Sequence, residues 1–152
     1  LIFRTSWVYA VRGNNFIKTM LRLARTQNQL SVINDQFGAP TGAALIADIT
    51  AQSIASYRTN PIVGIYHLAA NGITTWHEYA KYIIEFAIEK KQTLQVSLET
   101  IVPVTSSAFK TAAVRPLNSR LNTHKLAQVF KLQIPAWQDG VRHALTEILE
   151  PN

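Results

Sequence analysis

The sequence predicts a globular α/β fold, and three observations support this prediction. Short apolar stretches rich in β-branched and aromatic residues, typical of buried strands, alternate with longer stretches whose apolar residues recur at helical spacing. The 152 residues are 47% hydrophobic and 16% charged, as expected of a globular protein with a buried core. No apolar stretch approaches the roughly 18 residues that a membrane-spanning helix needs, so we expect no membrane partner.

The first apolar stretch, residues 1–9, predicts an interior strand of a sheet. It starts without a cap, a turn or a polar leader, so we expect the chain to begin inside a larger fold. The polar residues 4–6 and Trp7 lie toward the end of this strand. Because ligands of open α/β sheets bind just outside the carboxyl ends of the strands, this end is a candidate ligand site.

The next elements are predicted from a cap, a periodic pattern and turn residues. Asn15 can cap a helix whose apolar residues recur at helical spacing from Phe16 to about residue 27. Residues 30–33 predict a short strand. The glycines and the proline of residues 34–42 then predict a shaped loop.

The middle of the chain predicts two further helices and a strand between them. Thr41 is expected to cap a helix that runs to about Arg58, and residues 64–69 predict another buried strand. Residues 75–78 match the capping box, in which a Thr and a Glu satisfy each other's backbone N–H groups at a helix start. This helix is expected to end at the basic pair 90–91, where cations suit the helix dipole.

The last part of the chain predicts one strand and two helices. Residues 95–102 predict a strand and 103–111 a polar loop. Arg115 precedes a proline and therefore cannot lie inside a helix. A short helix is expected over 123–130, capped by its threonine, and a last helix with one apolar side follows Pro135.

The net charge of +6, from 15 basic and 9 acidic residues, favours a partner that carries phosphate. The basic residues are scattered singly apart from Lys90 and Lys91, without the stripe typical of a nucleic-acid-binding protein. We therefore expect a phosphate-bearing small molecule and no nucleic acid. The chain has no cysteine, which excludes disulfides, thiolate metal sites and cysteine nucleophiles and is compatible with a cytoplasmic protein.

Familiar catalytic and cofactor motifs are missing from the sequence. Its 6 glycines form no G-x-G-x-x-G or G-x-x-G-x-x-G turn, so no cofactor-binding residue is predicted. Its 4 histidines never stand at paired ligand spacing, so no metal ligand is predicted. No Tyr-x-x-x-Lys pair and no G-x-S-x-G motif occurs, so no catalytic residue is predicted.

Four residues are candidate ligand contacts, each with a structural alternative. Trp7, at a strand end, could stack on a nucleobase or sugar, or pack in the core against the first helix. Arg115, in a stiff loop, could bind a diphosphate bidentately, or be an ordinary surface residue. Gln36 follows Asp35 at a strand exit and could bond to a ligand hydroxyl or amide, or belong to an Asx turn. Asn15 could contact a ligand in addition to capping its helix.

Five segments, in a fixed order, carry a resemblance to a known family. They are Arg-Thr-Ser-Trp-Val-Tyr at 4–9, Asn-Phe-x-x-Thr-Met-Leu-Arg-Leu-Ala at 15–24, Asp-Gln-x-Gly-x-Pro-Thr at 35–41, Tyr-His-Leu at 66–68 and Arg-Pro-x-Asn-Ser-x-Leu-x-Thr-x-Lys at 115–125. Together they resemble the dTDP-4-dehydrorhamnose reductase family, and the resemblance extends over nearly the whole chain.

This resemblance implies an extended short-chain dehydrogenase. Residues 1–152 would be its C-terminal half, a late Rossmann strand plus a small mixed α/β substrate-binding domain, and the N-terminal NAD(P)-binding domain would be absent from this chain. The family reduces dTDP-4-dehydro-L-rhamnose to dTDP-L-rhamnose with NADPH or NADH, for cell-surface polysaccharides such as O-antigen, and a Tyr-x-x-x-Lys pair supplies the proton. Since neither this pair nor the glycine-rich turn is present, the chain alone is expected to be inactive.

The resemblance also bears on the candidate contacts and partners. Trp7 matches a family position that contacts the nucleotide sugar, and Arg115 lies where related enzymes hold the diphosphate. Gln36 and Asn15 are candidates by location only. A bound Mg²⁺ is compatible with the resemblance, although no ligands for it are identifiable in the sequence, and so is a homodimer.

Two other functions stay open. The regulatory β subunit of methionine adenosyltransferase resembles the same family, so the chain could belong to a non-catalytic regulatory or binding protein. It could also be a stand-alone nucleotide-sugar or protein-interaction module. That role would require a partner or a second copy to cover the first strand.

Overall fold

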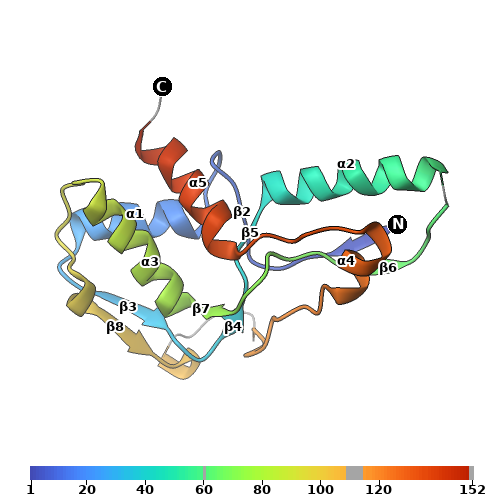
Figure 1. Ribbon diagram of the computed structural model, residues 1–152. Helices are drawn as coiled ribbons and strands as arrows, with labels where there is room; N and C mark the ends of the chain where they lie inside the picture. The colour runs from blue at the N-terminus through green and yellow to red at the C-terminus, as the bar shows by residue number, and fades with distance from the viewer. Residues whose placement is uncertain (60, 109–114, 151–152) are drawn as a thin grey trace.

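Two hydrophobic cores organise the computed structural model, which describes residues 1–59, 61–108 and 115–150. The larger core lies among the elements at the left of Figure 1, and the smaller one lies between the long helix and the short helix at the right. Helices alternate with strands that are mostly paired in parallel, so the predicted α/β class is confirmed.

Helices form most of the regular structure of the described residues. They are α1 (Phe16–Thr26), α2 (Ala43–Thr59), α3 (Trp76–Glu89), α4 (His124–Phe130) and α5 (Trp137–Leu149), with the 3-10 turns η1 (Leu98–Thr100) and η2 (Ser106–Ala108). The strands are β1 (Ile2–Arg4), β2 (Val8–Tyr9), β3 (Leu30–Ile33), β4 (Phe37–Gly38), β5 (Thr41–Gly42), β6 (Ile65–His67), β7 (Thr74–Thr75) and β8 (Ile101–Val104).

The strands pair two by two rather than in one broad sheet. The pairs β1–β6, β2–β5 and β3–β8 are parallel, and β4–β7 is antiparallel. Phe3 lies opposite Tyr66 in the first pair, and Leu30 lies opposite Ile101 in the third. Each parallel pair joins segments far apart in the sequence, which brings the carboxyl end of β3 close to the segment that follows β8.

The larger core is built by α1, α3 and α5 packed against β3 and β8. Helical spacing places Ile17, Leu21 and Ala24 on the buried side of α1. Phe16 and Leu23 of the same helix are only partly buried, which leaves part of Phe16 available to the cleft between α1, β3 and α3.

The predicted cap by Asn15 is confirmed, and the capping box predicted at residues 75–78 is seen in its threonine half, while the Glu78 carboxylate contacts the His77 ring. The Asn15 side chain accepts the backbone N–H of Lys18 at 3.2 Å, and the Thr75 hydroxyl accepts the backbone N–H of Glu78 at 3.1 Å. The caps explain why α1 and α3 begin where the sequence predicts.

Two other predicted caps are wrong. Thr41 lies in β5, where its hydroxyl donates to the Ala39 carbonyl and accepts the Ala70 N–H, so it joins two loops instead of capping α2. Thr123 occupies the N-cap position of α4, but its side chain makes no cap hydrogen bond. The Asn122 side chain accepts the first N–H of that helix instead.

The first stretch of the chain departs from the prediction of one continuous buried strand. Trp7 adopts a left-handed backbone conformation with φ 50°, which ends β1 and lets β2 pair with a different strand. Ile2 and Val8 are 58% and 50% exposed. The strand predicted over 95–102 is also shifted, because residues 98–100 form η1 and pairing with β3 begins at Ile101.

The segments between these elements follow the predictions more closely. Arg115 lies outside the helices, as its following proline requires. The loop predicted over 103–111 overlaps the end of β8 and then η2, and residues 109–111 lie outside the described part of the chain. Within the described ranges, no helix is both long and apolar enough to cross a membrane.

Candidate functional site

A cleft of about 890 Å³ opens between α1, β3, the start of α3 and the segment around η2. Its walls combine apolar and aromatic side chains with a few polar groups, the usual composition of a small-molecule site. The lining residues include Phe16, Met20, Ser31, Gln36, Trp76, Ser106, Ser107 and Arg115. The cleft lies at the exit of β3, where a ligand of a parallel strand pair is expected.

An aromatic group forms one wall of this cleft. The indole rings of Trp7 and Trp76 stack at 3.7 Å between centroids and 12° between planes. Phe16 contacts Trp76 at 4.7 Å, tilted by 50°. Of these three, Phe16 and Trp76 line the cleft, whereas Trp7 supports Trp76 from behind.

Gly38 leaves the space that the Trp7 indole occupies. A Cβ atom on Gly38 would lie 2.5 Å from Cε2 of Trp7, far inside van der Waals contact. The antiparallel pairing of β4 with β7 holds Gly38 beside the residues that precede Trp76. The glycine of the Asp-Gln-x-Gly segment therefore permits the stack of the two tryptophans.

A chain of side-chain hydrogen bonds continues behind the aromatic wall. The indole N–H of Trp76 donates to Oε1 of Gln36 at 3.1 Å, and the Gln36 amide donates to the Ser106 hydroxyl at 3.0 Å. The Ser106 hydroxyl and backbone N–H both donate to the carboxylate of Asp35. These donations by Ser106 hold the pKa of the Asp35 carboxyl below its usual value.

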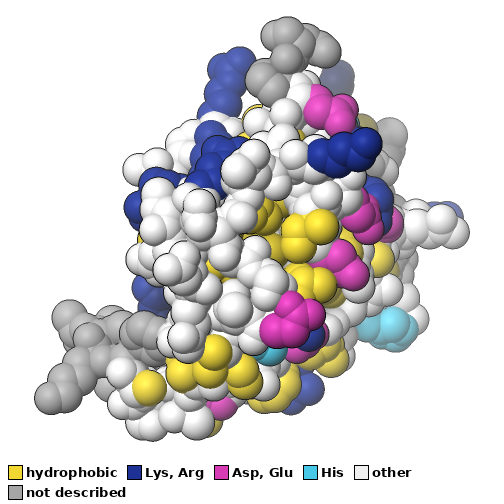
Figure 2. Space-filling model, turned by 90° about the vertical axis from the view of Figure 1, so that its left-hand side faces the viewer, with side chains coloured by type: hydrophobic (Ala, Val, Ile, Leu, Met, Phe, Trp, Pro, Cys, Tyr) yellow, Lys and Arg dark blue, Asp and Glu magenta, His cyan; other side chains and the backbone are white. Residues whose placement is uncertain are grey.

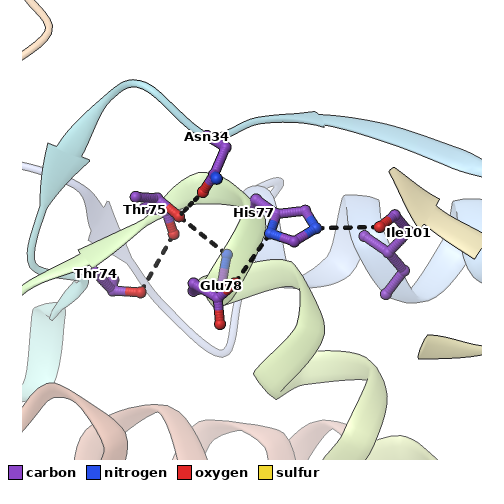
Figure 3. Close-up of polar contacts among 6 residues, drawn as sticks. All are labelled: Asn34, Thr74, Thr75, His77, Glu78 and Ile101. Carbon is purple, nitrogen blue, oxygen red and sulfur yellow. Dashed lines mark hydrogen bonds and ion pairs between the residues drawn. The ribbon is translucent and has the colours of Figure 1, made fainter. Parts of the chain in front are cut away.

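The start of α3, next to this wall, is fixed by a second set of polar contacts (Figure 3). The Thr75 hydroxyl donates to Oδ1 of Asn34 at 2.7 Å while it caps the helix. His77 is 7% exposed, and its two ring nitrogens lie 3.0 Å from a carboxylate oxygen of Glu78 and from the carbonyl of Ile101. The histidine thus joins α3 to β8.

The structure places the predicted ligand contacts in different surroundings. Gln36 and Arg115 both line the cleft, although they are far apart in the sequence. Trp7 lies behind the cleft wall. Asn15 has both side-chain groups engaged, because its amide also donates to the Ala10 carbonyl at 2.6 Å.

Sequence reasoning did not select Trp76 or Ser106 as site residues. The apolar spacing of α3 puts Trp76 on the side that packs against the core, where no ligand contact is indicated, and a serine in a polar loop has no distinguishing pattern. No short-range pattern in the sequence identifies either residue as part of a site.

A second, smaller cleft of about 510 Å³ lies near the carboxyl ends of β1 and β6. Ser6, Asn71, Arg120 and His124 are among its lining residues. The Ser6 hydroxyl donates to the Ser119 carbonyl at 3.2 Å, which ties the end of β1 to the segment after Arg115.

On one face of the molecule, Lys and Arg side chains lie along the upper left of the view, and Asp and Glu side chains lie mainly at the right, next to further Lys and Arg side chains and to apolar ones (Figure 2). Within residues 1–59, 61–108 and 115–150, there is no group of three or more His, Asp or Glu side chains that could hold a metal ion.

Comparison with known proteins gives consistent matches. Residues 1–150 match the family model described as the RmlD substrate binding domain. A curated relative from Escherichia coli strain K12, named dTDP-4-dehydrorhamnose reductase, is 53% identical over 97% of this chain and 49% of its own length. A relative of the same name from Shigella flexneri gives the same identity and coverage.

Solved structures agree with the sequence relatives. The dTDP-4-dehydrorhamnose reductase of Bacillus anthracis, solved in complex with NADP, has a TM-score of 0.78 and 35% identity over 96% of this chain and 48% of its own. The Clostridium acetobutylicum ortholog has a TM-score of 0.81 and 28% identity over 95% of this chain and 47% of its own. The chain spans about half the length of the curated relatives it matches.

Proposed function

Because the chain belongs to the RmlD substrate binding domain family, we propose that it forms the nucleotide-sugar-binding part of a dTDP-4-dehydrorhamnose reductase. The whole enzyme would reduce dTDP-4-dehydro-L-rhamnose to dTDP-L-rhamnose with NADPH or NADH. The single observation that carries the proposal is the 890 Å³ cleft, which brings an aromatic wall and Arg115 together.

The cleft suits the parts of a nucleoside diphosphate sugar. Phe16, Met20 and Trp76 offer apolar and aromatic surface for a base. Arg115 is exposed at the mouth of the cleft, and its planar guanidinium can bind two phosphate oxygens at once. Ser31 and Ser107 add hydroxyl groups that can hydrogen-bond to a sugar.

The residues of this chain do not fit the nicotinamide cofactor. None of the 6 glycines belongs to a glycine-rich turn that would seat a pyrophosphate on a helix N-terminus. We therefore propose that residues 1–152 are the C-terminal half, with the last Rossmann elements and the substrate-binding domain, and that a companion domain binds NADP(H). The pairing of β1 with β6 supports this division, because such a pair is what an edge of a Rossmann sheet would provide.

Proton delivery is also assigned to the companion domain. Two tyrosines of the larger core, Tyr9 and Tyr79, have raised pKa values because burial disfavours the phenolate. No tyrosine of this chain is followed four residues on by a lysine, the spacing of the Tyr-x-x-x-Lys pair in which the lysine lowers the pKa of the tyrosine. The residues of this chain thus bind and orient the nucleotide sugar, and none is proposed as the acid.

We propose that the whole enzyme is cytoplasmic, that its partner is the nucleotide sugar and that it forms a homodimer. An exposed apolar area offers a surface that a companion domain or a second subunit could cover. This β1–β6 surface consists of Leu1, Ile2, Val63 and Ile65, which are 41%, 58%, 72% and 43% exposed.

Calorimetric titration with dTDP tests the proposed site. Trp7→Ala should weaken binding by about 1 to 3 kcal/mol because the wall formed by Trp76 loses its support. Arg115→Lys should weaken it about tenfold, because an ammonium cannot form the bidentate fork. Arg58→Lys, at the exposed end of α2, is the matched control and should bind as the unchanged protein does. Equal affinity in all four proteins would remove the site from this cleft.

A further inference from the structure

We propose that Gln36 is a positioning residue which fixes the indole of Trp76 as the aromatic wall of the cleft. This inference rests on the proposed function for the identity of the ligand, a nucleoside diphosphate. From its place in the sequence, Gln36 was expected to hydrogen-bond to a hydroxyl or amide of the ligand. Here it orients another side chain instead.

The Gln36 amide is buried, and both its oxygen and its nitrogen are hydrogen-bonded to other side chains. Gln36 is 7% exposed, although it borders the cleft. Its oxygen accepts the Trp76 indole N–H, and its nitrogen donates to the Ser106 hydroxyl. Since a carboxamide has one oxygen and one nitrogen, these two bonds fix its orientation and select which atom faces the indole.

Ser106 determines that orientation because it is itself anchored. Its hydroxyl proton goes to the Asp35 carboxylate, and its backbone N–H goes to the same carboxylate at 2.9 Å. The hydroxyl oxygen can then only accept a hydrogen bond from Gln36. The amide nitrogen must therefore face Ser106, and the amide oxygen must face Trp76.

The indole of Trp76 is held at a second place by stacking. Trp7 lies against it at 3.7 Å, and Trp7 in turn lies against the Cα of Gly38. Stacking alone allows a ring to slide or rotate within its plane, whereas the hydrogen bond at Nε1 fixes that rotation. The combination sets the edge of Trp76 that the cleft presents to a ligand.

The test compares three variants of the protein at its full natural length. Gln36→Met removes both hydrogen bonds at nearly unchanged volume, Gln36→Glu keeps an acceptor for the Trp76 indole, and Gln128→Met alters an exposed residue of α4 as the control. The first readout is the indole N–H resonance of Trp76 in ¹⁵N-tryptophan-labelled protein without ligand, assigned by its loss in Trp76→Phe. The second is the dissociation constant for dTDP.

We expect the Trp76 resonance to shift and lose its protection from solvent exchange in Gln36→Met, with about fivefold to tenfold weaker binding of dTDP. In Gln36→Glu and Gln128→Met the resonance should stay protected. An unchanged, protected resonance in Gln36→Met would overturn the positioning role. If the unchanged protein does not bind dTDP, the proposed function fails, while the resonance still decides the role of Gln36.

Discussion

The side-chain hydrogen bonds that start at the Trp76 indole end at the carboxylate of Asp35. It accepts the hydroxyl and backbone N–H of Ser106, and the hydroxyl bond is the larger cause of its lowered pKa. A carboxyl whose pKa is lower in the folded state stabilises the fold above its unfolded pKa. That contribution is lost as the pH falls through the folded pKa.

Asp35→Asn should therefore destabilise the protein at pH 7, and the difference from the unchanged protein should shrink as the pH falls below about 4, where the unfolded carboxyl begins to be protonated. Urea denaturation midpoints at pH 7 and pH 3 measure this. Ser106→Ala, which removes the hydroxyl donor, should show the same trend. A destabilisation of equal size at both pH values would contradict the role given to this carboxylate.

Single residues were predicted well where their effect is local. The side chain of Asn15 was identified as a helix cap because a cap depends only on its next few neighbours. Trp76 was missed because its role depends on Trp7 and Gln36, which no short-range pattern connects to it. The left-handed backbone conformation of Trp7 could not be predicted from the sequence either, since tryptophan has no preference for that conformation.

The start of helix α3 is fixed by one side chain, that of Thr75. Thr75 caps it and also donates to Asn34 in the segment after β3, so one hydroxyl fixes both the helix start and its place beside the cleft. Thr123 occupies the corresponding position of α4 without a side-chain cap bond. The two threonines form a natural matched pair.

Thr75→Ala should lower the free energy of unfolding by about 1 to 2 kcal/mol, because a helix cap and the Asn34 contact are both lost. Thr123→Ala should change it by less than about 0.5 kcal/mol. Thermal or urea denaturation of the two variants gives the comparison. Equal losses would show that the cap geometry does not carry the difference.

Elements with strong local patterns, such as α1, α3, α5 and β3, were predicted near their observed positions. The strand β8 was displaced because its limits are set by pairing with β3, a contact between distant segments. The first nine residues were predicted as one strand because their composition is uniform, whereas the chain turns at Trp7 and its two strands, β1 and β2, pair with different partners. The limits of these strands therefore depend on pairing between distant segments, which composition alone does not reveal.

At the scale of the whole molecule, the β1–β6 surface is the most unusual feature. Ile2 and Ile65 face each other in this short parallel pair, and Leu1 and Val63 lie in the segments just before the two strands. Strand edges with exposed apolar residues promote association. The 152-residue chain on its own should therefore self-associate as its concentration rises. Light scattering at increasing concentration measures this.

Two matched variants test whether self-association depends on the β1–β6 surface or on exposed apolar residues in general. Ile65→Lys should reduce the self-association, whereas Ile88→Lys, at a similarly exposed position on α3, should leave it unchanged. A compact monomer of the unchanged chain at high concentration would count against a surface that needs covering.

We propose that this chain supplies the nucleotide-sugar side of a reductase and needs a cofactor domain to act. The most direct measurement joins it to the half of the Escherichia coli relative that it does not match, in place of the matched half, and follows NADPH absorbance with dTDP-4-dehydrorhamnose. The chain alone should show no turnover, and the fusion should oxidise NADPH only when the keto sugar is present. No turnover by the fusion, with an active intact relative as control, would contradict the account and favour a regulatory or binding role.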